Sequence, residues 1–163
     1  MLTIIPYQNA NPDAVRRIYA ESVAANPQGF VQDMSFHGDI MTQAADMTAE
    51  GGVFLVALLE DTPIGIGGLK PQKEYGIYEL CKLHVLGTYH GKGYGKMLSW
   101  GLIDAARAKG ADAVTLHVTA TQEAAIGLYE HIGFERTDRK TYEVQLGNMI
   151  QSFDTVFMRL ALS

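Results

Sequence analysis

Residues 86–98, which read LGTYHGKGYGKML, decide which fold the chain can adopt. Glycines alternate at positions 91, 93 and 95, directly before apolar residues that recur at helical spacing. Inside regular structure each glycine costs about 0.5–1 kcal/mol relative to alanine, so the cluster needs a reason. One reason is a strand-to-helix turn that requires positive φ angles. The other is a loop whose bare N–H groups close around an anion at the helix N-terminus.

Two common phosphate-binding loops do not match this stretch. The triphosphate loop, GxxxxGK followed by Ser or Thr, is absent from the chain. The dinucleotide fingerprint GxGxxG would place a third glycine at position 96, where the chain has Lys96. Residues 90–95 instead fit the pattern Gln or Arg, x, x, Gly, x, Gly or Ala, with His90 in the first position.

The segments on both sides of the glycines predict a mixed α/β chain. Short apolar or alternating runs predict seven strands, over residues 2–6, 52–60, 64–69, 75–85, 113–118, 134–144 and 152–162. Apolar positions at helical spacing predict four helices, over residues 12–25, 39–47, 94–109 and 121–132, the last capped by Thr121. No repeat or low-complexity linker interrupts this order, so we expect a single domain of α+β type over residues 1–163.

Composition limits the class of partner. The formal net charge is −5 and the 13 basic residues are scattered, which argues against a nucleic-acid surface. Cys81 is the only cysteine, so a disulfide framework or a multi-cysteine metal site is excluded. The sequence has neither a basic leader followed by an apolar run nor a stretch of about 18 apolar residues. We therefore expect a cytoplasmic protein with no membrane partner.

Two motifs together resemble the GNAT superfamily of acyl-CoA-dependent N-acyltransferases. Residues 79–98, ELCKLHVLGTYHGKGYGKML, resemble the fourth strand, pyrophosphate loop and following helix of that family. Residues 124–134, AAIGLYEHIGF, resemble its Ala-x-x-Leu-Tyr-x-x-x-Gly-Phe signature. The resemblance implies a GNAT fold, with about seven strands and about four helices and with the sheet splayed between the fourth and fifth strands. It also implies acetyl-CoA as the co-substrate.

The resemblance also implies which residues bind acetyl-CoA. The N–H groups of the glycine loop and the positive end of the following helix would hold its diphosphate. A strand bulge around residues 83–85 would present backbone groups to the pantetheine arm and the thioester carbonyl. Two positions depart from the family pattern, because His90 replaces Gln or Arg and Gln122 replaces a frequent Asn. The implied binding residues are Leu83, Val85, His90, Gly91, Lys92, Gly93, Tyr94, Gly95, Lys96, Gln122 and Tyr129.

Three residues are candidates for the chemistry. Tyr129 stands at the signature tyrosine and would protonate the departing thiolate, unless it serves only in packing. An amine acceptor must lose a proton before it attacks, which calls for a general base. Glu79 is the first candidate and His84 the second, although a carboxylate on a strand is also common on a solvated face. We expect no metal site, and we expect the other histidines, His37, His117 and His131, to be ordinary surface or satisfied residues.

The expected activity is transfer of an acetyl group from acetyl-CoA to a primary amine by direct attack. The acceptor, a small molecule or a peptide, would contact residues 20–40, the turn after Leu69 and residues 142–152. Two alternatives stay open: a non-catalytic acyl-CoA sensor, and an acyltransferase that uses a hydroxyl acceptor or a longer acyl donor. A homodimer is also left open.

Overall fold

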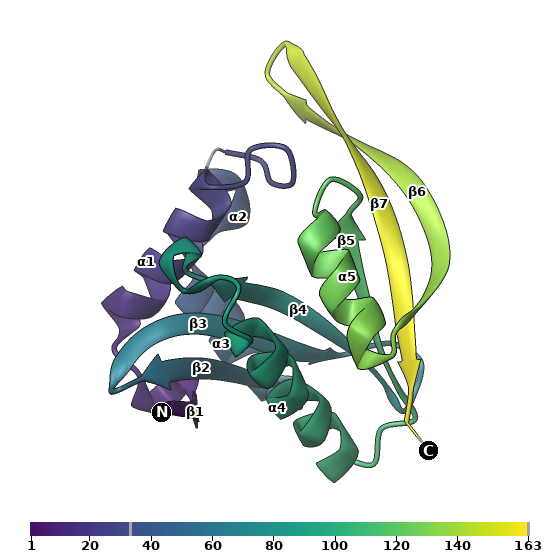
Figure 1. Ribbon diagram of the computed structural model, residues 1–163. Coiled ribbons are helices and arrows are strands. Elements are labelled where there is room, and N and C mark those ends of the chain that lie inside the picture. Colours follow the sequence, from purple (N-terminus) through teal and green to yellow (C-terminus); the bar gives the residue numbers. More distant parts are fainter. Residues whose placement is uncertain (33, 163) are drawn as a thin grey trace.

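The computed structural model describes residues 1–32 and 34–162, and one mixed sheet runs through it (Figure 1). Its strands lie in the order β1-β2-β3-β4-β5-β7-β6; β4 and β5 are parallel and every other neighbouring pair is antiparallel. The strands are β1 (Leu2–Pro6), β2 (Val53–Leu59), β3 (Thr62–Pro71), β4 (Ile77–Val85), β5 (Ala113–Thr119), β6 (Glu135–Leu146) and β7 (Met149–Ala161). The seven predicted strands are therefore confirmed, with shifts of a few residues at their ends.

Helices cover both faces of the sheet. The longer ones are α1 (Pro12–Ala24), α3 (Ile40–Ala49), α4 (Tyr94–Ala108) and α5 (Glu123–Ile132). Short turns of helix add α2 (Met34–His37), η1 (Tyr7–Asn9) and η2 (Gly87–Tyr89). Buried residues of α1 and α3 form one core cluster with β2 and β3, and those of α4 and α5 form another with β5 and β7. The expected Thr121 cap is wrong, since Gln122 occupies the N-cap of α5 and makes no side-chain capping bond.

The sheet opens between β4 and β5. Only three pairs join these strands, and the last is Glu79 with Thr115. Beyond it β4 continues to Val85 and β5 to Thr119 without pairing to each other. The expected splay between the fourth and fifth strands is confirmed.

A β-bulge lies in β4 next to this opening. Ile66 of β3 faces His84 and Gly68 faces Cys81, so two steps on β3 match three on β4. The extra residue is accommodated at Lys82, whose φ of 55° is left-handed. The bulge therefore begins at residues 82–83, slightly earlier than the expected 83–85.

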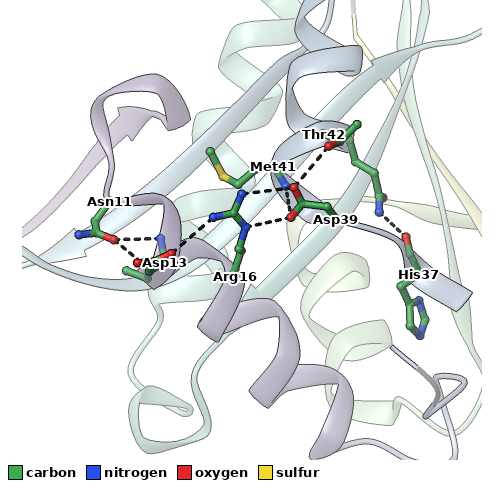
Figure 2. Close-up of polar contacts among 9 residues, drawn as sticks. Asn11, Asp13, Arg16, His37, Asp39, Met41 and Thr42 are labelled. Carbon is green, nitrogen blue, oxygen red and sulfur yellow. Dashed lines mark hydrogen bonds and ion pairs between the residues drawn. The ribbon is translucent and has the colours of Figure 1, made fainter. Parts of the chain in front are cut away.

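Polar contacts fix the start of α1 against the start of α3 (Figure 2). The Asn11 side chain caps α1 by accepting from the N–H groups of Asp13 and Ala14. Arg16 on α1 donates to both carboxylate oxygens of Asp39, at 3.0 and 3.3 Å. Asp39 in turn caps α3, and the Arg16 guanidinium holds the pKa of Asp39 below its usual value. The Arg16–Asp39 contact anchors the end of the connection between α1 and α3, part of which lines the cavity described below.

The hairpin of β6 and β7 extends past α5 (top of Figure 1). In the described part of the chain, no helix combines the length and the apolar character needed to cross a membrane.

Candidate active site

A cavity of about 1530 Å³ runs along the opening between β4 and β5. Its walls come from β4, the glycine stretch with the start of α4, β5, α5, the hairpin of β6 and β7, and α1 with the segment after it. Every residue proposed from the sequence for acetyl-CoA binding or catalysis lines this cavity except Lys92. Lys92 is exposed. Of the segments proposed for the acceptor, parts of 20–40 and 142–152 line it and the turn after Leu69 does not.

The glycine loop presents backbone to open space. Gly91 and Gly93 have φ angles of 78° and 83°, and a Cβ on either would meet nothing within 4 Å. Gly93 is the N-cap of α4 and brings no side chain, so the first N–H groups of the helix remain available. Gly95 also lines the cavity, and its N–H belongs to the first turn of α4. A positive helix end behind bare N–H groups fits the diphosphate of acetyl-CoA.

Two side chains near this loop, those of His90 and Lys96, contact other parts of the protein. The His90 ring nitrogen Nε2 lies 2.6 Å from the Val85 carbonyl oxygen, to which it donates. The Lys96 ammonium lies 3.0 Å from Nε2 of His131 on α5. His90 therefore makes a contact within the protein where the family pattern has Gln or Arg.

Glu79 lies at the last paired position before the opening. Its side chain is 24% exposed, and its Oε2 is 3.7 Å from Nδ1 of His117 on β5. This contact raises the pKa of His117, and burial opposes it only in part. Sequence reasoning treated His117 as an ordinary residue, because its contact with Glu79 depends on the register between β4 and β5. In that register Glu79 pairs with Thr115, which shares a strand face with His117.

Tyr129 comes to the cavity from α5, on the other face of the sheet. It is 6% exposed and packs edge-on against Phe134, with ring centroids 5.7 Å apart. Burial raises the pKa of its phenol, so the hydroxyl stays protonated at neutral pH. The opening therefore brings a carboxylate from one strand and a phenol from a helix to one space.

His84 is buried between aromatic rings. Its ring centroid lies 5.4 Å from that of Tyr19 and 5.3 Å from that of Phe30. Burial lowers its pKa to about 3, so the imidazole is neutral and accepts protons weakly. This environment favours Glu79 over His84 as the base.

Two further cavity residues were not singled out from the sequence, although Ser22 lies in the segment 20–40 that was expected to contact the acceptor. The Lys82 ammonium lies 3.3 Å from the Tyr19 hydroxyl and 5.4 Å from its ring centroid. The Ser22 hydroxyl is buried and has no hydrogen-bond partner among the described residues. Neither could be found from the sequence, because both depend on how α1 packs on the bulged strand. In the same described part, no three His, Cys, Asp or Glu side chains gather as metal ligands would.

Comparison with known proteins places these features in a wider group. Residues 13–134 match the family described as the acetyltransferase (GNAT) family. N-acetylaspartate synthetase of Danio rerio is 31% identical over 133 residues, which are 80% of this chain and 47% of that protein. The uncharacterized N-acetyltransferase YjgM of Escherichia coli (strain K12) is 38% identical over 90 residues, which are 54% of each chain. The chain thus spans about half the length of these relatives.

Solved structures share the fold. N-acetyltransferase from Staphylococcus aureus Mu50 superposes with a TM-score of 0.84 at 17% identity, covering 100% of this chain and 99% of that chain. YncA of Salmonella typhimurium, solved with its cofactor acetyl-CoA, gives a TM-score of 0.82 at 23% identity, with 100% and 95% covered.

Proposed function

The chain belongs to the GNAT acetyltransferase family, as its two motifs predicted, and we propose that it transfers an acetyl group from acetyl-CoA to a primary amine by direct attack. One observation carries the proposal: a single cavity joins the glycine loop to Glu79 and Tyr129 through the opening between β4 and β5. A binding loop alone would need no base and no acid beside it. Acetyl-CoA, when bound, supplies an acyl group activated as a thioester.

The loop and the end of β4 hold the co-substrate. The N–H groups of residues 91–95 bind the diphosphate. Leu86 donates its N–H to the Ile64 carbonyl of β3, so by strand alternation the backbone groups of Val85 face the opening. The N–H of Val85 is the donor that we assign to the acyl oxygen, where negative charge develops.

Glu79 prepares the amine. An alkylammonium with a pKa of about 10.4 is almost wholly protonated at neutral pH and cannot attack. The Glu79 carboxylate takes the proton, directly or through one water. His117 holds this carboxylate at the mouth of the opening, since it contacts Glu79 at 3.7 Å.

Tyr129 returns a proton on the opposite side. The phenol donates to the departing sulfur, whose free thiol has a pKa of about 8.5. In a buried site the CoA thiolate is disfavoured, as the Tyr129 phenolate is. The sulfur therefore takes the proton of Tyr129 as negative charge develops on it. When the tetrahedral intermediate collapses, the nitrogen loses its second proton, which returns to the Tyr129 phenolate through water. Glu79 then releases its proton to solvent, so the net reaction gives the amide, CoA thiol and one proton.

The test is release of CoA thiol from acetyl-CoA across amines, including polyamines, amino acids, aminoglycosides and peptides. We expect turnover with one acceptor class. Tyr129→Phe and Glu79→Gln should each lower kcat by about 10²–10⁴-fold with acetyl-CoA affinity unchanged. Tyr7→Phe is the matched control, because Tyr7 lies on η1 and does not line the cavity, and the activity of this variant should stay at the wild-type level.

Other outcomes would point elsewhere. Binding of acetyl-CoA without turnover on any acceptor would favour a sensor and contradict the proposal. Turnover only with hydroxyl acceptors, or only with longer acyl donors, would keep the acyltransferase but overturn the proposed acceptor or donor.

A further inference from the structure

We infer that the acceptor amine also carries a carboxylate, which Lys82 binds within the cavity together with the Ser22 hydroxyl. This inference rests on the proposed acetyl transfer and names the class of its acceptor. Free amino acids and short peptides with a free C-terminus have this chemistry. Three observations carry it: the backbone of Lys82, the surroundings of its ammonium, and the position of Ser22.

The backbone of Lys82 is held in an unfavourable conformation at the site. In the described ranges, the non-glycine residues with positive φ are Glu60, Asp61 and Lys82. The first two form the turn between β2 and β3, where such angles are common. Lys82 lies inside a strand, opposite Gly67, where the bulge directs its side chain to Tyr19 on α1. Strain of this kind gathers at functional sites, where the surrounding structure maintains it.

Among the described residues, the Lys82 ammonium has neutral partners and no counter-ion. Tyr19 contacts it by hydroxyl and ring, and both are neutral groups. Over residues 1–32 and 34–162, no carboxylate lies within 4.0 Å of it. The Lys and Arg side chains that do have such a partner are Arg16, Arg17, Arg107, Arg136, Arg139 and Lys140. A half-buried cation fixed on a cavity wall without an anion is a site for an anionic ligand group.

Ser22 adds a second donor on the same wall. It lies one turn after Tyr19 on α1, so the two side chains share a helix face. Both residues line the cavity, as Lys82 does. The buried Ser22 hydroxyl lacks a protein partner among the described residues, which leaves its hydrogen-bonding capacity for a bound molecule.

The charges on β4 match both ends of such an acceptor. Glu79 precedes Lys82 by three residues, roughly 10 Å along an extended strand, which exceeds the separation of the two charges in a single α-amino acid and suits a short peptide with a free C-terminus better. Glu79 receives the ammonium end and Lys82 the carboxylate end of one small zwitterion. One cation and one hydroxyl suit a singly charged carboxylate better than a phosphate dianion, which generally takes more donors.

The experiment compares matched acceptors. Free α-amino acids and dipeptides are assayed beside their C-terminal amides, which keep the amine and lose the carboxylate. We expect the wild type to prefer the acids by about 10- to 100-fold in kcat/KM. A preference confined to amino acids or to dipeptides identifies the source of the carboxylate.

Variants at Lys82 test the residue itself. Lys82→Met should raise KM for the acids, leave the amides unchanged and abolish the preference, whereas Lys82→Arg should restore much of it. Lys82→Gly removes the same charge but suits the positive φ, so it gives the same loss in a well-folded protein. Ser22→Ala should reduce the preference by a smaller factor. Lys109→Met, at the far end of α4, should behave as the wild type.

Failure of this inference differs from failure of the proposed function. Equal turnover of acids and amides, or a preference that survives in Lys82→Gly, overturns the carboxylate site and leaves the acetyltransferase standing. If no amine of either kind is acetylated while acetyl-CoA still binds, the carboxylate site and the proposed function are both overturned.

Discussion

At the scale of single residues, surroundings decide which groups are charged. Two histidines near the opening show how strongly position changes the pKa of an imidazole. His117 is 54% exposed and lies beside a carboxylate, which favours its charged form. His84 is enclosed by aromatic rings, and burial brings its pKa to about 3. An imidazole therefore favours its charged form beside Glu79 on β5, whereas on β4 burial keeps it neutral. Sequence reasoning gave His84 a catalytic role and His117 none, because neighbours in space are not neighbours in the chain.

The pairing of Glu79 with His117 predicts a pH-dependent signal. Because the contact raises the pKa of His117 in the folded state, its imidazole should titrate above 6.5 by NMR. The stabilisation is fully present below about pH 6.5 and is lost as the pH rises through the folded pKa. Glu79→Gln should lower the pKa of His117, because it removes the contact that raises it. A midpoint unchanged by Glu79→Gln would contradict the pair.

At the level of elements, two glycines differ in whether the packing around them leaves room for a side chain. Gly67 of β3 faces the bulge, and a Cβ there would lie 2.7 Å from Leu102 Cδ1 and 3.2 Å from Leu83 Cδ1. Gly127 is exposed inside α5, where a Cβ would meet nothing within 4 Å. The first glycine lets α4 pack against the bulged strands, and the second only weakens its helix.

Two alanine substitutions should therefore shift stability in opposite directions. Gly67→Ala should lower the free energy of unfolding by about 1–3 kcal/mol through overpacking. Gly127→Ala should raise it by about 0.5–1 kcal/mol, because alanine is the better helix former. Urea unfolding of both variants beside the wild type measures this. A neutral Gly67→Ala would mean that Leu102 can move aside and that the bulge does not depend on this close packing.

Sequence patterns predicted the long elements and failed on the short ones. The alternation in residues 75–85 and the apolar spacing after Tyr94 correspond to β4 and α4 within about two residues. The single turns α2 and η2 were missed, since three or four residues carry no periodicity. The left-handed Lys82 was also out of reach, because a bulge depends on the register with β3 and not on its own residues.

At the scale of the whole molecule, the site exists because β4 and β5 stop pairing after Glu79 and leave an opening in the sheet. The order of elements and two motifs were enough to predict the GNAT fold and the splay. Residues 20–40 and 142–152 were expected near the acceptor, but how α1, the segment after it and the distant β6–β7 hairpin meet around one cavity could not be predicted. One tertiary contact shows this: the Thr119 hydroxyl at the end of β5 donates to the Gly29 carbonyl, 90 positions away, at 3.1 Å.

The measurement that tests the central claim most directly is calorimetric titration of acetyl-CoA into the wild type, Gly93→Glu and Gly110→Glu. Gly93 and Gly110 flank opposite ends of α4 with φ angles of 83° and 75°, and a Cβ at either meets open space, so the two substitutions strain the backbone alike. Only Gly93→Glu adds bulk and negative charge where the diphosphate should lie. We predict that the wild type and Gly110→Glu bind acetyl-CoA and that Gly93→Glu, still folded, does not. Equal affinity in all three proteins would contradict the assignment of the glycine loop, and with it the path from that loop to Glu79 and Tyr129.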